Sequence, residues 1–201
     1  MASDFSGPHV DLHLGFFDGK DKGAQYSAAG VADGWGREHK FSSSELGIGA
    51  GYNWVKNDIV YGLEASISAK NSDTKLLQDS QNGVPVPGNP IESRVDNTAS
   101  IVAKIGKIYN QKTMIYLLGG VASAEIYRSF NTSLKTTDWN TGWTAGAGIE
   151  HQFTSDYTVK AQFRHANYGE DKISTSSISW NDHQIQEYSE QIITFSIGKY
   201  F

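Results

Sequence analysis

Six charged residues occur where the surrounding sequence alternates between apolar residues and small polar ones. They are Glu45, Glu64, Lys104, Glu150, Lys160 and Arg164. Each falls on the less apolar face of an expected strand, and successive side chains of a strand point to opposite faces of a sheet. If that face lines an enclosed space, the carboxylates and cations must pair, because an unpaired buried charge is strongly destabilising. The residue types therefore predict a network of salt bridges.

The six histidines raise the question of a metal or haem site. His39 and His183 fall in expected long loops, but no His-x-x-x-His or comparable ligand spacing occurs, so we expect no metal site. Asp182 and His183 are the nearest approach to a catalytic pair, and a solvated loop pair is the simpler interpretation. Serine, histidine and aspartate lie outside the strand–turn–helix context of a nucleophile. The sequence thus predicts no catalytic residues and no enzyme.

The segments that carry these residues alternate with the two-residue period of β-strands. Eight such segments are expected, at about residues 7–17, 41–54, 59–68, 96–108, 113–127, 142–153, 157–167 and 188–201. Connections after the second, fourth and sixth are short, and four long loops are expected at about 18–40, 71–94, 128–141 and 168–187. Strands in series without helices predict an all-β fold, an eight-stranded antiparallel up-and-down β-barrel over residues 1–201.

The composition suits this fold and excludes several functions. The chain has 21 glycines, only 4 prolines, 10 tyrosines and 9 phenylalanines. A net charge of -5 without a basic stripe argues against nucleic acid, and the absence of cysteine excludes disulfides and thiolate metal sites. The sequence contains no run of 18 or more apolar residues, so no transmembrane helix is expected. The first residues lack a basic segment followed by an apolar core, which indicates a mature chain with an added initiator Met or a protein not exported by that route.

Alternation leaves two ways to orient the barrel wall. A soluble lipocalin-like carrier would turn the apolar face inward around a ligand, and an outer-membrane barrel would turn it outward to lipid. The sparse charges of the polar face and the uncharged centres of the apolar face favour lipid outside. Aromatic residues near strand ends suit two interfacial girdles. These are Tyr52, Trp54, Tyr61, Trp143, Phe153, Tyr157 and Phe201.

With lipid outside, the polar face lines a lumen that eight strands leave just wide enough for side chains to fill. The six charges are then expected to plug the lumen, and the alternative is a gated ion path in which the charges re-pair. Gly47, Gly49 and Gly51 recur at period two within one strand. This spacing indicates space for lumen side chains and not a phosphate-binding loop.

Four motifs resemble the Omp25/Omp31-like outer-membrane proteins of alphaproteobacteria, within the OmpA/OmpX-type barrel class. They are Ile59-Val60-Tyr61-Gly62-Leu63-Glu64, Gly142-Trp143-Thr144-Ala145-Gly146-Ala147-Gly148-Ile149-Glu150, Phe163-Arg164-His165-Ala166-Asn167-Tyr168-Gly169 and Ile197-Gly198-Lys199-Tyr200-Phe201. The resemblance covers most strands and fails in the loops. His165 and Lys199 depart from the family pattern.

The resemblance implies a location in the cell outer membrane of a Gram-negative bacterium, in contact with lipid and lipopolysaccharide. It also implies insertion by the barrel assembly machinery, which reads a terminal aromatic such as Phe201. A haemin-binding branch of the family raises the alternative that His39 or His183 binds haemin. The expected function is a non-enzymatic barrel that needs no cofactor and serves envelope structure and surface or host contact. Haemin or small-ligand binding at the loops and a soluble carrier are the alternatives.

Overall fold

The computed structural model describes residues 5–72, 75–76, 78–86, 91–130, 134–178 and 182–201. The strands of this part are β1 (Gly7–Tyr26), β2 (Ala32–Lys56), β3 (Ile59–Asn71), β4 (Lys75–Leu76), β5 (Gln78–Gln81), β6 (Val84–Val86), β7 (Ile91–Tyr109), β8 (Thr113–Phe130), β9 (Leu134–Gln152), β10 (Tyr157–Ser174) and β11 (His183–Tyr200), and η1 (Ser176–Ile178) is a short 3₁₀ turn. No helix among the described residues has the length and apolar character to cross a membrane.

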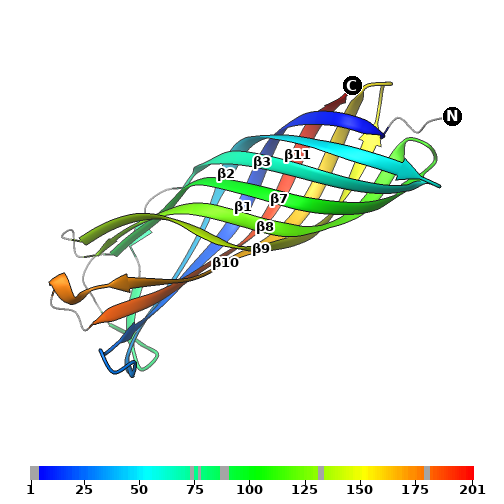
Figure 1. Ribbon diagram of the computed structural model, residues 1–201. Coiled ribbons are helices and arrows are strands. Elements are labelled where there is room, and N and C mark those ends of the chain that lie inside the picture. Colours follow the sequence, from blue (N-terminus) through cyan, green and yellow to red (C-terminus); the bar gives the residue numbers. More distant parts are fainter. Residues whose placement is uncertain (1–4, 73–74, 77, 87–90, 131–133, 179–181) are drawn as a thin grey trace.

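Eight of the described strands close into a barrel (Figure 1). The hydrogen-bonded order is β1-β11-β10-β9-β8-β7-β3-β2, and β2 pairs again with β1. All these pairs are antiparallel, and they join strands that follow one another in sequence except at two places. The first and last strands, β1 and β11, close the ring, and β4, β5 and β6 intervene between β3 and β7. Following Cα partners once around the ring from Lys20 returns to Val10, so the register is staggered by ten residues. Such a stagger requires strongly tilted strands.

The two ends of the barrel differ. At the end that carries both termini, which we call the turn end, short connections join β2 to β3, β7 to β8 and β9 to β10. Asn57 and Asp58 have φ values of 51° and 62° there, the left-handed conformation of a tight two-residue hairpin turn. At the opposite end, which we call the hairpin end, the strands continue as hairpins beyond the barrel (Figure 1).

The hairpin end differs from the expected four long loops. The segment predicted as a loop over 18–40 is mostly strand, because β1 continues to Tyr26 and β2 begins at Ala32. β10 and β11 likewise extend through most of 168–187, and β8 and β9 through the described part of 128–141. These extensions are polar on both faces, so their sequence lacks the alternation that marks a half-buried strand.

The apolar face of the barrel wall points outward, as predicted. Leu12, Ile48 and Leu117 are 56%, 59% and 62% exposed. Asp11 and Glu150, on the alternating inward face, are buried. A continuous exposed apolar band of this kind does not suit water, since large apolar patches mark contact with lipid or partners. The soluble carrier with an apolar interior is therefore wrong.

Two groups of apolar side chains also lie inside the barrel. The group near the turn end contains Phe5, Val60, Val102, Ile108, Met114, Tyr116, Leu118 and Tyr200. The group toward the hairpin end contains Phe17, Phe41, Val95, Ala122, Ala124, Ile126, Ala166, Tyr168, Tyr188 and Ile192. The lumen is thus filled by apolar as well as charged residues. The weak polar contrast of β8 follows, because its inward Tyr116 and Leu118 belong to one of these groups.

Candidate functional site

The first charged cluster of the lumen is centred on Lys160, whose side chain extends inward from β10. Its ammonium donates to Asp11 Oδ2 at 3.0 Å and to Glu64 Oε2 at 3.2 Å. Lys104 lies 3.6 Å from the same Glu64 oxygen and 3.8 Å from Glu150. Three carboxylates and two lysines from five strands therefore meet in a space with almost no exposure to solvent.

Three side chains of β1 reach this cluster across glycines of β2. His9, Asp11 and His13 are the Cα partners of Gly51, Gly49 and Gly47. A Cβ on Gly47 would lie 2.4 Å from His13 Nε2 and 2.5 Å from Ser68 Oγ. The glycines therefore let the β1 side chains lean over β2 toward β3, where His13 Nε2 lies 2.9 Å from Ser68 Oγ. The prediction that this Gly-x-Gly-x-Gly run provides lumen space is confirmed.

Replacing Gly47 with valine is expected to lower the free energy of unfolding by roughly 1–3 kcal/mol, the usual cost of overpacking a filled interior. The added atoms would push His13 away from Ser68. Urea unfolding in lipid vesicles, followed by tryptophan fluorescence, measures the change. Ala103→Val on the outward face of β7 is the matched control, and equal effects of the two variants would contradict this role for Gly47.

A second cluster lies toward the hairpin end and is centred on Lys70. Its buried ammonium lies 2.9 Å from Glu45 Oε2 and 2.7 Å from Glu190 Oε2, and 3.7 Å from the centre of the Phe17 ring. Arg164 lies 3.9 Å from Glu45 Oε1 and donates to Ser100. The hydroxyls of Tyr168 and Tyr188 both donate to Glu190. This cluster is therefore both charge-paired and hydrogen-bonded, as stable buried ion pairs require.

A third cluster closes the interior at the hairpin end. Arg128 of β8 donates to Asp21 of β1 and to Asp171 of β10, and its Nη1 lies 3.0 Å from Asp171 Oδ2. Burial raises the pKa of the Asp171 carboxyl, although the nearby Arg128 guanidinium acts in the opposite direction. One guanidinium thus joins three strands where they leave the barrel.

All six charged residues predicted for the lumen point into it, and they divide between two clusters. Glu64, Lys104, Glu150 and Lys160 lie in the first cluster, and Glu45 and Arg164 in the second. Asp11, Lys70 and Glu190 also take part in these clusters and were not among the predicted residues. The sequence does contain a sign of Lys70, because it follows Glu64, Ser66 and Ser68 at two-residue spacing and so lies on the same inward face of the strand.

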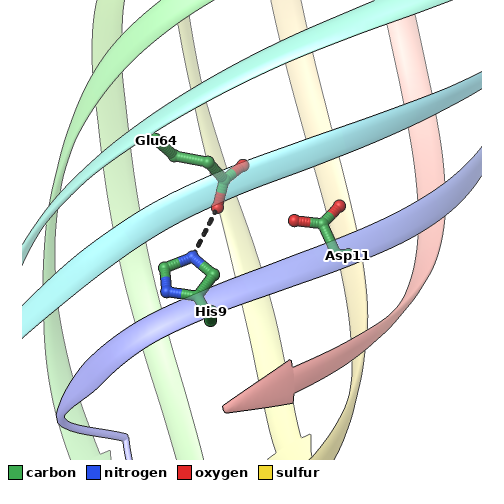
Figure 2. A group of neighbouring side chains, drawn as sticks. All are labelled: His9, Asp11 and Glu64. Atoms are coloured by element: carbon green, nitrogen blue, oxygen red, sulfur yellow. Dashed lines mark hydrogen bonds and ion pairs between the residues drawn. The ribbon is translucent and has the colours of Figure 1, made fainter. Parts of the chain in front are cut away.

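His9, Asp11 and Glu64 resemble a metal-ligand set, which the sequence did not predict. Their ligand atoms lie within 4.8 Å of one another, and His9 Nε2 is 3.3 Å from Glu64 (Figure 2). The Lys160 ammonium already contacts both carboxylates. Since a metal ion would have to displace this buried cation, the group is better described as part of the salt-bridge cluster.

An Asp–His–Ser sequence of contacts also occurs in the lumen. Asp11 Oδ1 lies 3.4 Å from His13 Nδ1, and His13 Nε2 contacts Ser68. A cavity on the same inward face, next to Ser66 and Ser100, has a volume of about 10 Å³, room for about one water molecule. Ser68 is itself buried among the described side chains of the lumen, so we interpret its contact with His13 as packing.

His39 and His183 do not lie in loops, which corrects the prediction. His39 belongs to β2 and His183 to β11, and both rings are buried. His39 stacks on Phe41 and His183 on Tyr26. Their Cα partners on β1, Asp21 and Tyr26, are five residues or ~16 Å apart along the strand. The two imidazoles therefore do not converge on one iron.

The predicted interfacial aromatics point outward but gather at one end. Tyr52, Trp54, Tyr61, Phe153, Tyr157 and Phe201 are exposed around the turn end. Only Trp143 of the predicted set lies toward the hairpin end, where it packs near His165. The expected pair of girdles is thus uneven.

Comparisons with known proteins agree with this geometry. Residues 1–198 match the family model described as outer membrane protein beta-barrel domain. The 31 kDa outer-membrane immunogenic protein of Brucella melitensis is 28% identical over 131 residues, which cover 61% of this chain and 53% of that protein. The 25 kDa outer-membrane immunogenic protein of Brucella ovis is 27% identical, over 87% of this chain and 74% of that protein. The chain thus spans about half the length of the first of these relatives.

Among solved structures, the outer membrane protein OprG from Pseudomonas aeruginosa aligns with a TM-score of 0.67 at 12% identity. The alignment covers 98% of this chain and 96% of OprG, and at this identity it shows the fold alone. An apolar outer face, a filled lumen and a family model that covers nearly every residue lead to one assignment. The chain belongs to the outer membrane protein beta-barrel family and lies in the outer membrane of a Gram-negative bacterium.

Proposed function

We propose that this protein is a non-enzymatic outer-membrane barrel, closed along its axis, that anchors strand hairpins at the cell surface. The observation that carries the proposal is the filling of the lumen. Charged clusters centred on Lys160, Lys70 and Arg128 share the lumen with the two apolar groups, and Lys70, for example, lies against the Phe17 ring. A continuous water path would have to displace both the charged and the apolar side chains.

The hairpins supply the surface for contact outside the membrane. In barrels of this kind the short turns face the periplasm and the long connections face outward. The extensions of β1, β2, β8 and β9 then stand beyond the lipid, where Val31 and Trp139 are 63% and 51% exposed. The name "immunogenic" carried by the Brucella relatives supports a surface role of this kind, in envelope structure and contact with host molecules.

Planar-bilayer recording tests the closed lumen. Purified protein is expected to give no steady conductance, because Lys160 and Lys70 hold carboxylates from different walls together. A large, stable open state in most insertions would contradict the proposal. Brief, voltage-dependent openings would favour a gated ion path with re-pairing charges. The same protein must first migrate as a folded, heat-modifiable band in gel electrophoresis, so that an absence of conductance cannot be due to a misfolded protein.

Haemin binding has weaker support. Each buried imidazole could offer iron a single ligand, and stacking against Phe41 or Tyr26 occupies one face of each ring. Surface contact through the hairpins is therefore the function that the arrangement favours.

A further inference from the structure

A trough crosses the lipid-facing wall of the barrel. It has a volume of about 680 Å³, within the ~300–1,000 Å³ typical of ligand pockets. Its axis follows one row of outward residues that are Cα partners on five adjacent strands. From β10 to β3 these are Tyr157, Lys199, Val10, Ala50 and Ala65.

Small side chains make the trough. Ala50 and Ala65 form its floor on β2 and β3. The next row consists of the larger Ile197, Leu12, Ile48 and Ile67, which form one wall. Because the strands are tilted, the trough runs obliquely from the turn end into the middle of the apolar band.

Lys199 stands at the turn end of the trough. Its ammonium lies 5.0 Å from the centre of the Phe201 ring and 5.7 Å from that of Tyr157. Both rings belong to the exposed aromatics at the membrane boundary. No carboxylate in the described part of the chain forms an ion pair with Lys199. A cation in an aromatic frame at headgroup level, next to an apolar trough, matches the chemistry of a lipid with a phosphate head and an acyl tail.

We propose that the trough binds one phospholipid of the periplasmic leaflet, with its phosphate on Lys199 and an acyl chain over Ala50 and Ala65. The proposal rests on the outer-membrane location and is independent of whether the lumen conducts. A second copy of the chain fits less well. Outward positions of the five strands carry no carboxylate within the apolar band, so a partner barrel would leave Lys199 without a counter-charge.

Native mass spectrometry of the full chain in detergent, titrated with phosphatidylglycerol, tests the site. The wild-type protein is expected to retain one lipid at activation energies that strip the others. Lys199→Gln should weaken this retention at least tenfold. The double variant Ala50→Leu/Ala65→Leu should weaken it similarly while keeping the cation. Lys107→Gln, at an outward lysine near Tyr109 but outside the trough, is the matched control and should retain the lipid.

If all four proteins retain the lipid equally, the proposal is overturned. It is also overturned if Lys107→Gln loses the lipid as readily as Lys199→Gln does. A dimer in the wild type that the double variant abolishes, without any retained lipid, would assign the trough to a second copy instead. Each protein is first checked for heat-modifiable migration, so that a misfolded variant cannot pass for one that has lost the site.

Discussion

Replacing Lys160 with methionine is expected to lower the free energy of unfolding by about 3–5 kcal/mol, the cost of breaking a buried ion pair by removing one partner. The ammonium contacts Asp11 at 3.0 Å and Glu64 at 3.2 Å, and its side chain is almost fully buried. Methionine keeps most of the volume but leaves two carboxylates without their shared cation. Urea unfolding in lipid vesicles, read as loss of the heat-modifiable band, gives the free energy.

Two further variants separate charge from shape. Lys160→Met combined with Glu64→Gln removes one cation and one carboxylate, so the net charge of the cluster is the same as in the wild type. Lys104 still has Glu150 as a partner in this variant. This double variant should recover a large part of the lost stability. Glu38→Gln removes an exposed carboxylate near Lys20 and Lys40 and should leave stability unchanged. A Lys160→Met protein as stable as the Glu38→Gln control would show that the lumen cluster contributes packing alone.

The sequence was sufficient to predict which way the wall faces. Strict alternation over Val10–Phe16 and Leu46–Trp54 separates the two sides, and the uncharged centres of the apolar side fit hydrocarbon. The sequence also predicts inward Glu64 and Lys160, because their parity in a strand is unambiguous. It does not tell which inward charges become neighbours. That depends on the stagger of ten residues around the ring, which no single strand encodes.

The parts that sequence reasoning missed share a physical cause. Beyond the lipid band both faces of a strand meet water or polar partners. The sequences of the hairpin extensions therefore lack the two-residue alternation of apolar and polar residues and resemble those of loops. Lys70 and Glu190 lie at this boundary and were left outside the expected strands or network. His39 and His183 were misplaced for the same reason. Inward apolar residues such as Tyr116 were hidden because β8 is apolar on both sides.

A cation in the middle of the lipid-facing band tests the orientation of the wall most directly. Ala147 lies on the outward face of β9, with Leu117 and Phe163 as its Cα partners. Ala147→Arg is expected to destabilise the inserted barrel by roughly 2–4 kcal/mol, the cost of arginine near the bilayer midplane. The measurement is the folded fraction in vesicles as a function of urea.

The control places the same side chain on the same face but outside the hydrocarbon. Ser42 is exposed on β2 beyond the apolar band and donates a hydrogen bond to Asp18. Arginine at this position would meet headgroups and the Asp18 carboxylate, so Ser42→Arg should insert like the wild type. If both arginines are tolerated, or both are not, the loss does not depend on depth, and the exposed apolar band is not a membrane span. A loss confined to Ala147→Arg leaves hydrocarbon as the only solvent that fits this face.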